Sequence, residues 1–231
     1  MFCKPLLAVF VLANLSSAAL AQSFSGGNLS IDAYGYSDGA DDVSINYSGA
    51  LEYSVNRALS VAVDVSQYDS TILNDDITNV TVHGLYHLGD GASLGFFAGQ
   101  DYTNTRGGTF YGLEGGLETG AFAAEGYVSV YDNTESSTVL GVSGAYKFNQ
   151  SVSAIADISF AKVASESYTR LSAGAEYQIV DGPSIYAEIG NIDGGNQDGR
   201  FIGLGVNLDF GVDRGTTFGR RSIWETAKLA F

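Results

Sequence analysis

The chain has 231 residues, 45% hydrophobic and 16% charged, and its 26 acidic side chains outnumber the 11 basic ones. A net charge of −15 argues against nucleic acid as a partner, because phosphate binding requires a basic surface. The single cysteine is Cys3, so no disulfide framework, cysteine metal site or thiol catalysis is expected in the body of the chain. Thirty glycines, 14 tyrosines and 13 phenylalanines beside few charges indicate a folded, all-β protein.

Residues 1–21 have the pattern of a secretory signal peptide. Lys4 provides the positive start, residues 5–15 are apolar, and Ala19-Leu20-Ala21 offers a small-x-small cleavage site. A membrane anchor is disfavoured, since a spanning helix needs about 20 apolar residues. We therefore expect an exported protein with a signal peptide at 1–21, a barrel at 22–210 and a basic tail at 211–231.

From residue 29 to residue 210 the chain repeats a pattern of about ten alternating residues followed by turn residues. In residues 43–55, apolar Val43, Ile45 and Tyr47 alternate with polar Ser44 and Asn46. Successive side chains of a strand point to opposite faces, so each segment has one apolar and one polar face. The pattern predicts twelve strands, near residues 28–37, 43–55, 58–68, 78–88, 92–102, 108–118, 121–132, 137–148, 151–161, 168–180, 184–191 and 200–210.

The connections favour a transmembrane barrel over a soluble β-sandwich, which also alternates. Tight turns such as Asn56-Arg57 and Thr119-Gly120 alternate with longer polar loops such as 69–77 and 192–199. Short periplasmic turns, longer external loops and an even strand number are typical of outer-membrane barrels. We therefore predict an all-β fold, a single antiparallel transmembrane β-barrel of about 12 strands.

Aromatic residues of the apolar faces gather near the strand ends. Two aromatic girdles at the membrane–water interfaces are expected of such a barrel. The predicted girdle residues are Tyr47, Tyr53, Tyr86, Tyr102, Tyr111, Phe122, Tyr146, Phe148, Phe160, Tyr177 and Phe210.

The polar face carries eleven acids and two bases among many Gly, Ser and Ala residues. In a barrel this face looks into the lumen. The predicted pore-lining residues are Asp32, Glu52, Asp64, Asp101, Glu114, Glu118, Glu125, Lys147, Asp157, Arg170, Glu176, Glu188 and Asp209.

At this level the chain resembles the Gram-negative outer-membrane β-barrels of the porin-like family. The signal peptide, the rhythm of strand, turn and loop, and the aromatic strand end at Leu208-Asp209-Phe210 carry the resemblance. It implies the cell outer membrane as location, outer-membrane lipid and lipopolysaccharide as surroundings, and small solutes or cations as partners. It implies neither a cofactor nor an enzyme. The chain departs from the pattern because 21 residues follow the last predicted strand.

Eleven lumen acids facing two bases predict a water-filled lumen, since each unpaired charge in a dry interior costs several kcal/mol. Acidic rings are used by cation channels, so we expect a channel for passive diffusion of small cations or neutral solutes. Two alternatives stay open: a closed barrel whose acids pair with the few bases, and a structural or surface-binding barrel without a pore.

Catalysis is the less favoured reading. The two histidines, His83 and His87, lie two pleats apart on the polar face of one strand, near Ser44, Ser60 and Ser66. A hydrolase requires a nucleophile, a base and an orienting group within hydrogen-bond reach, and serine is too abundant here for this proximity to be specific.

Acidic loops offer oxygen atoms suited to Ca²⁺ or Mg²⁺, although no twelve-residue calcium loop is present and no metal site is predicted. They hold Asp38, Asp41, Asp42, Asp75, Asp76, Asp193, Asn196 and Asp198.

The tail, 211–231, is rich in basic residues, with Arg214, Arg220, Arg221 and Lys228. Ser222 to Glu225 form a capping box, which indicates a short periplasmic helix. The helix could rest on the membrane interface through Trp224 or enter the acidic lumen as a basic plug. A frayed end and a further strand are the other two interpretations of the tail.

Overall fold

A computed structural model describes residues 24–37, 43–70, 75–89, 91–103, 107–132, 137–163, 166–180, 182–194, 199–211 and 216–224. The predicted signal peptide lies outside these residues. Within them the chain forms twelve antiparallel strands: β1 (Phe24–Tyr36), β2 (Val43–Ser54), β3 (Leu59–Ser70), β4 (Asp75–His87), β5 (Ala92–Tyr102), β6 (Gly108–Thr119), β7 (Phe122–Asp132), β8 (Ser137–Lys147), β9 (Val152–Val163), β10 (Glu166–Gln178), β11 (Ser184–Gly194) and β12 (Gly199–Gly211).

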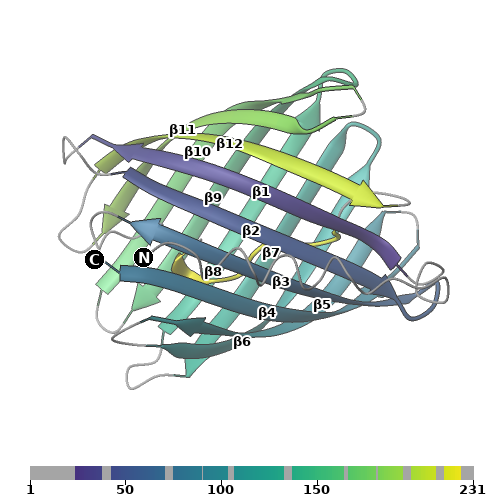
Figure 1. The fold of residues 1–231 in the computed structure, drawn as a ribbon, viewed down its shortest axis with the longest axis horizontal. Helices are drawn as coiled ribbons and strands as arrows, with labels where there is room; N and C mark the ends of the chain where they lie inside the picture. The colour runs from purple at the N-terminus through teal and green to yellow at the C-terminus, as the bar shows by residue number, and fades with distance from the viewer. Residues whose placement is uncertain are drawn as a thin grey trace, which may run out of the picture.

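The strands close into one barrel (Figure 1). Each strand pairs with its neighbours in the sequence, and β12 pairs with β1, so that Gly26 lies opposite Gly211 and Tyr36 opposite Phe201. The prediction of a single antiparallel barrel of twelve strands is confirmed, and the β-sandwich is excluded. The start of β1 and the end of β12 therefore lie at the barrel end that carries the tight turns.

Several strands extend further into the predicted loops than alternation indicated. β3 and β4 reach Ser70 and Asp75, inside the loop predicted at 69–77, and β11 continues to Gly194. The backbone ladder continues there with polar side chains, since Asp69 lies opposite Asp76. Hydrogen bonding between strands does not require apolar residues, so the hydrophobic pattern underestimates strand length.

The apolar faces of the strands look outward. Val61, Leu113 and Leu204 are 41%, 61% and 57% exposed. On β12, exposed Ile202 alternates with buried Phe201 and Gly203. Because a soluble protein would bury these side chains, the alternation is that of a barrel with an apolar exterior.

Glycine permits two of the tight turns. Gly91, between β4 and β5, has φ +88°, and Gly120, between β6 and β7, has φ +53°. A Cβ atom on Gly91 would lie 2.0 Å from the backbone oxygen of Glu118, so a larger residue has no room there.

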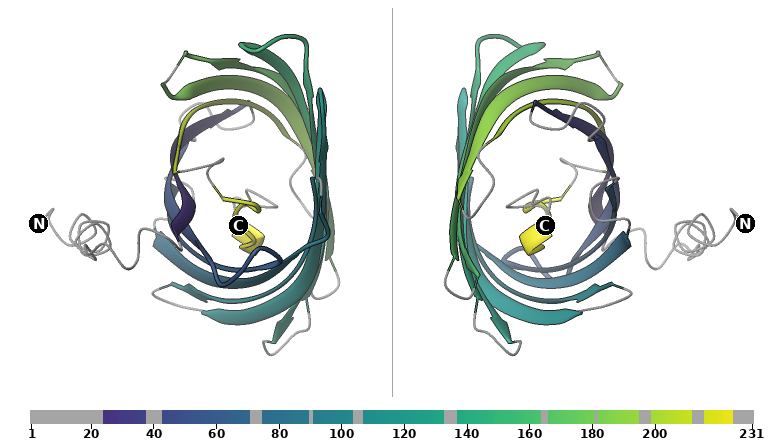
Figure 2. Two further views of the ribbon diagram at one scale, coloured as in Figure 1. Left: turned by 90° about the vertical axis from the view of Figure 1, so that its right-hand side faces the viewer. Right: turned by 90° about the vertical axis from the view of Figure 1, so that its left-hand side faces the viewer.

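The described part of the C-terminal tail lies inside the ring of strands, where it is drawn in yellow (Figure 2). We call residues Thr216–Trp224 the C-terminal segment. In this segment Ile223 and Trp224 have helical backbone, and Ser222 Oγ accepts a hydrogen bond from the Trp224 amide at 3.2 Å. Among the described residues, no helix is long and apolar enough to cross a membrane.

Candidate functional site: the barrel interior

The predicted pore-lining residues fall into two groups in the structure. Seven are buried in the interior, namely Asp32, Glu52, Asp64, Asp101, Glu114, Arg170 and Glu188. The other six are half-buried or exposed: Glu118, Glu125, Lys147, Asp157, Glu176 and Asp209. Four of the second group, Glu118, Glu125, Asp157 and Asp209, line one cavity described below.

The predicted girdle residues all belong to outward-facing positions. Tyr53 is half-buried because its ring meets that of Phe24 edge-on, with ring centroids 5.8 Å apart. The other ten are exposed: Tyr47, Tyr86, Tyr102, Tyr111, Phe122, Tyr146, Phe148, Phe160, Tyr177 and Phe210.

Large aromatic rings also line the interior, which the sequence pattern did not indicate. Each of six rings lies against a glycine directly opposite it on the neighbouring strand, where an added Cβ would come within 2.3–2.4 Å of a ring atom. The pairs are Phe97 with Gly112, Phe110 with Gly99, Tyr127 with Gly141, Tyr34 with Gly203, Tyr186 with Gly205, and Phe201 with Gly190. The glycines therefore make room for rings on the wall instead of lining an empty channel.

The C-terminal segment is bound along the interior by the acids of the wall. The Thr217 amide donates to Glu52 Oε2 at 2.7 Å, near the turn end of β2. Ser222 Oγ donates to Asp101 Oδ1 at 2.9 Å, next to the loop end of β5. The segment therefore runs from one end of the barrel interior towards the other.

Arg221 makes a buried ion pair with the wall. Its Nε donates to Glu114 Oε2 at 2.7 Å, and its Nη1 lies 3.4 Å from Glu125 Oε1. The guanidinium carbon stands 4.5 Å from the centre of the Tyr127 ring. Burial alone would lower the pKa of Arg221, but the carboxylates of Glu125 and Glu114 raise it above its ordinary value, so the side chain stays charged.

A chain of hydrogen bonds holds Glu114 in place. Its Oε1 lies 2.8 Å from His83 Nδ1, and His83 Nε2 lies 2.8 Å from Asp64 Oδ2. Both ring nitrogens of His83 thus face carboxylates, and Glu114 joins the histidine of β4 to the arginine of the tail. These contacts fix the orientation of the Glu114 carboxylate.

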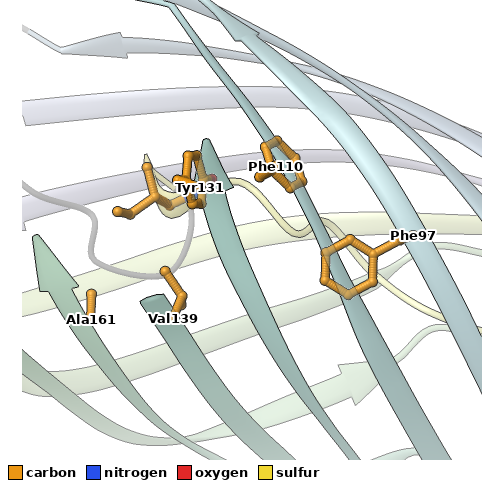
Figure 3. Packing of buried hydrophobic residues seen from close by; sticks show 6 residues of the cluster. Phe97, Phe110, Tyr131, Val139 and Ala161 are labelled. Atoms are coloured by element: carbon orange, nitrogen blue, oxygen red, sulfur yellow. The ribbon is translucent and has the colours of Figure 1, made fainter. Parts of the chain in front are cut away.

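Beyond Arg221 the segment ends in an apolar cluster near the loop end of the barrel (Figure 3). Ile223 packs with Phe97, Phe110, Tyr131, Val139 and Ala161, and its amide donates to the Tyr131 hydroxyl. Phe218, at the other end, is buried against Ala62 and Leu85. Apolar contacts therefore flank the charged pair on both sides.

Two further arginines, Arg220 of the C-terminal segment and Arg170 of β10, pair with acids of the wall. Arg220 Nη2 donates to Asp32 Oδ2 at 2.8 Å, and the Tyr186 hydroxyl donates to the other oxygen of Asp32 at 2.8 Å. Arg170 bridges Asp157 at 2.5 Å and Glu188 at 2.8 Å. The interior bases are thus held by carboxylates from several strands.

A cavity of about 590 Å³ remains beside the segment, on the side of β6 to β12. It is lined by Glu118, Glu125, Asp157, Glu188 and Asp209 together with Arg170 and Arg220. Five carboxylates and two guanidinium groups therefore lie in the wall of this cavity.

The second histidine, His87, contacts two serines. Its Nε2 lies 2.9 Å from Ser60 Oγ and its Nδ1 lies 2.9 Å from Ser93 Oγ, while Glu52 Oε1 is 3.7 Å from Nε2. In a hydrolytic triad the acid contacts the ring nitrogen remote from the nucleophile. With Ser60 as the nucleophile that nitrogen faces Ser93, and with Ser93 as the nucleophile Glu52 is 3.7 Å from it, beyond hydrogen-bond distance. In the part of the chain that the structure describes, no group of three or more His, Cys, Asp or Glu side chains is arranged to hold a metal ion. Asp38, Asp41, Asp42, Asn196 and Asp198 of the acidic loops lie outside that part.

The closed barrel, apolar exterior and charged interior define an outer-membrane type of transmembrane β-barrel. No family model and no curated protein matches the sequence. Solved structures do match the fold. The KdgM porin superposes with a TM-score of 0.62 at 13% identity, covering 79% of this chain and 99% of that one.

Two other channels give similar superpositions. The NanC porin has a TM-score of 0.62 at 9% identity, with 78% of this chain and 98% of that chain covered. An outer membrane channel from Pseudomonas putida F1 has a TM-score of 0.55 at 10% identity, with 85% and 100% covered. The chain therefore has the porin fold.

Proposed function

We propose that this protein is an outer-membrane channel for the passive diffusion of small solutes, with a preference for cations or neutral molecules. The observation that carries the proposal is the cavity of about 590 Å³, in which five carboxylates face two arginines. A water-filled cavity with an acidic wall attracts cations and repels anions. The likeness to outer-membrane porins supports the same class of function through the fold alone.

The location follows from the exterior. Exposed apolar side chains such as Ile31, Leu113 and Ile189 suit contact with outer-membrane lipid, and the exposed tyrosines and phenylalanines near the strand ends suit the interfaces. We propose that lipopolysaccharide surrounds the loop end, with residues 1–21 removed on export. Protein sequencing of the mature N-terminus tests the cleavage.

The deciding experiment is recording from purified protein in planar bilayers with unequal salt on the two sides. A reversal potential of the sign for cations supports the proposal, and one of the sign for anions contradicts it. The KdgM porin was also solved in complex with oligogalacturonate, an acidic sugar chain. The acidic cavity of this chain does not favour a polyanion.

A second function is favoured by one observation, the C-terminal segment inside the lumen. A barrel filled in this way could be structural or could act through its surface without conducting. Recordings separate the two functions: a barrel that stays silent with the tail present and with residues 212–231 deleted has no pore. Conductance in either form supports the channel.

A further inference from the structure

The wall that receives Arg221 has the features of a ligand site. Glu114 and Glu125 contact the edge of the guanidinium group, at 2.7 Å and 3.4 Å, while Tyr127 lies against its face at 4.5 Å. A planar guanidinium satisfies edge and face contacts at once, whereas an ammonium group is a compact point charge without a face. The three residues come from β6 and β7, far from the tail in sequence. We call Glu114, Glu125 and Tyr127 the guanidinium site.

This wall is held in shape by contacts that do not involve the tail. His83 binds Glu114 at 2.8 Å and is itself held by Asp64 at 2.8 Å. The Tyr127 ring lies over Gly141 and meets Phe97 edge-on, with ring centroids 6.2 Å apart. Loss of the Arg221 side chain therefore leaves a formed site with two carboxylates that need a cation.

A second cavity of about 200 Å³ is lined by Glu125, Tyr127 and Arg221. It shares Glu125, Arg170 and Arg220 with the larger cavity of about 590 Å³. A small cation that enters the larger cavity can thus approach the guanidinium site.

From this geometry we infer that the barrel interior contains a binding site for guanidinium-bearing solutes, which Arg221 of the C-terminal segment occupies as a built-in ligand. Guanidinium-bearing solutes are thereby the solute class for the proposed channel. Their transport rests on the proposed function, whereas their binding does not require conduction. A tethered group has an effective concentration in the millimolar range, so a free solute competes poorly while Arg221 is present.

The test is rescue of the full-length Arg221→Ala variant in detergent. The probe is n-propylguanidinium, which carries the missing guanidinium group on a short alkyl chain, and the matched probe is n-propylammonium at equal ionic strength. We expect n-propylguanidinium to raise the thermal unfolding temperature of the variant by about 3 °C at ten times its Kd. Its Kd, measured by calorimetry, should be at least ~10-fold lower than that of n-propylammonium, because an ammonium group cannot make the edge contacts with both carboxylates and the face contact with Tyr127 at once.

Arg57→Ala is the control variant, since Arg57 is exposed in a tight turn outside the interior. Neither probe should stabilise the control or the wild-type protein. Equal stabilisation by both probes, equal effects on the control, or absence of binding to Arg221→Ala would each overturn the inference.

Arg221→Ala could fail to fold, and the readout is then the refolding yield, followed by heat-modifiable gel mobility. Recovery with n-propylguanidinium and not with n-propylammonium supports the site, and equal or absent recovery contradicts it. Because this assay measures no current, a silent bilayer recording leaves its outcome unchanged. Failure of the channel and failure of the site are therefore distinguishable.

Discussion

Arg221 Nε donates a hydrogen bond to Glu114 Oε2 at 2.7 Å, although 107 residues separate the two in the sequence. The side chains of this pair are 2% and 0% exposed. The other oxygen of Glu114 contacts His83, so this carboxylate joins the arginine of the tail to the histidine of β4.

Removing the buried guanidinium should destabilise the barrel strongly. Arg221→Ala leaves Glu114 and Glu125 without their cation, and breaking a buried ion pair from one side costs about 3–5 kcal/mol. Urea unfolding in detergent measures the free energy of unfolding. Arg57→Ala, at an exposed turn, should change it by no more than about 0.5 kcal/mol. An equally small effect of Arg221→Ala would show that the contact contributes nothing to stability.

Deleting residues 212–231 should raise single-channel conductance, because it empties the part of the interior that the C-terminal segment fills. The full-length variant Arg220→Gln with Arg221→Gln keeps nearly the same volume without the charges. If volume obstructs the pore, this variant conducts less than the deletion. Unchanged conductance after deletion would mean that the tail does not obstruct solute flow.

The acids of the larger cavity should set charge selectivity. Asp209 is exposed and forms a hydrogen bond with Asn28 at 2.7 Å, so Asp209→Asn is expected to preserve folding. The variant should shift the reversal potential in a salt gradient towards that of a non-selective pore, since a fixed negative charge is lost. Glu166→Gln is the control, because Glu166 is exposed at the loop end of β10 and does not line this cavity. Equal shifts in both variants would assign selectivity to the overall charge of the protein.

The exterior should tolerate a charge according to depth. Leu113 lies at the middle of β6 and is 61% exposed. Leu113→Arg should destabilise by about 2–4 kcal/mol, as expected at the midplane of a bilayer. Val180 is more exposed, at 79%, but lies beyond the end of β10, so Val180→Arg should cost about 0–1 kcal/mol. Measurement of folding in lipid vesicles checks both, and equal effects would contradict membrane insertion by this face.

Local alternation predicted most of the fold. The side-chain period of a strand is two, so a run such as Val43 to Val55 assigns each residue to the exterior or the interior without knowledge of its partners. The same rule placed Leu113 and Leu204 on the exterior and Glu114 in the interior. Strand ends were less predictable because polar residues such as Asp69 and Asp76 still pair through their backbones.

Prediction of the groups that fill the lumen requires the register of the strands and the closure of the barrel. Gly112 and Phe97 are separated by 15 positions, and only their alignment across β5 and β6 shows that the glycine makes room for the phenylalanine ring. A glycine-rich polar face therefore looked emptier in the sequence than it is. The sequence also left the tail between the membrane interface, the lumen, a strand and a frayed end.

The number of strands, the face on which each side chain lies and the acid-rich polar face can thus be predicted from the sequence, since each depends on neighbours one or two positions apart. The partner of each acid depends on atoms brought together from distant strands, and no local pattern encodes that meeting. Glu114 illustrates the difference: its inward direction follows from its place between Leu113 and Gly115, but its contacts with His83 and Arg221 exist because the closed barrel surrounds its own C-terminal segment.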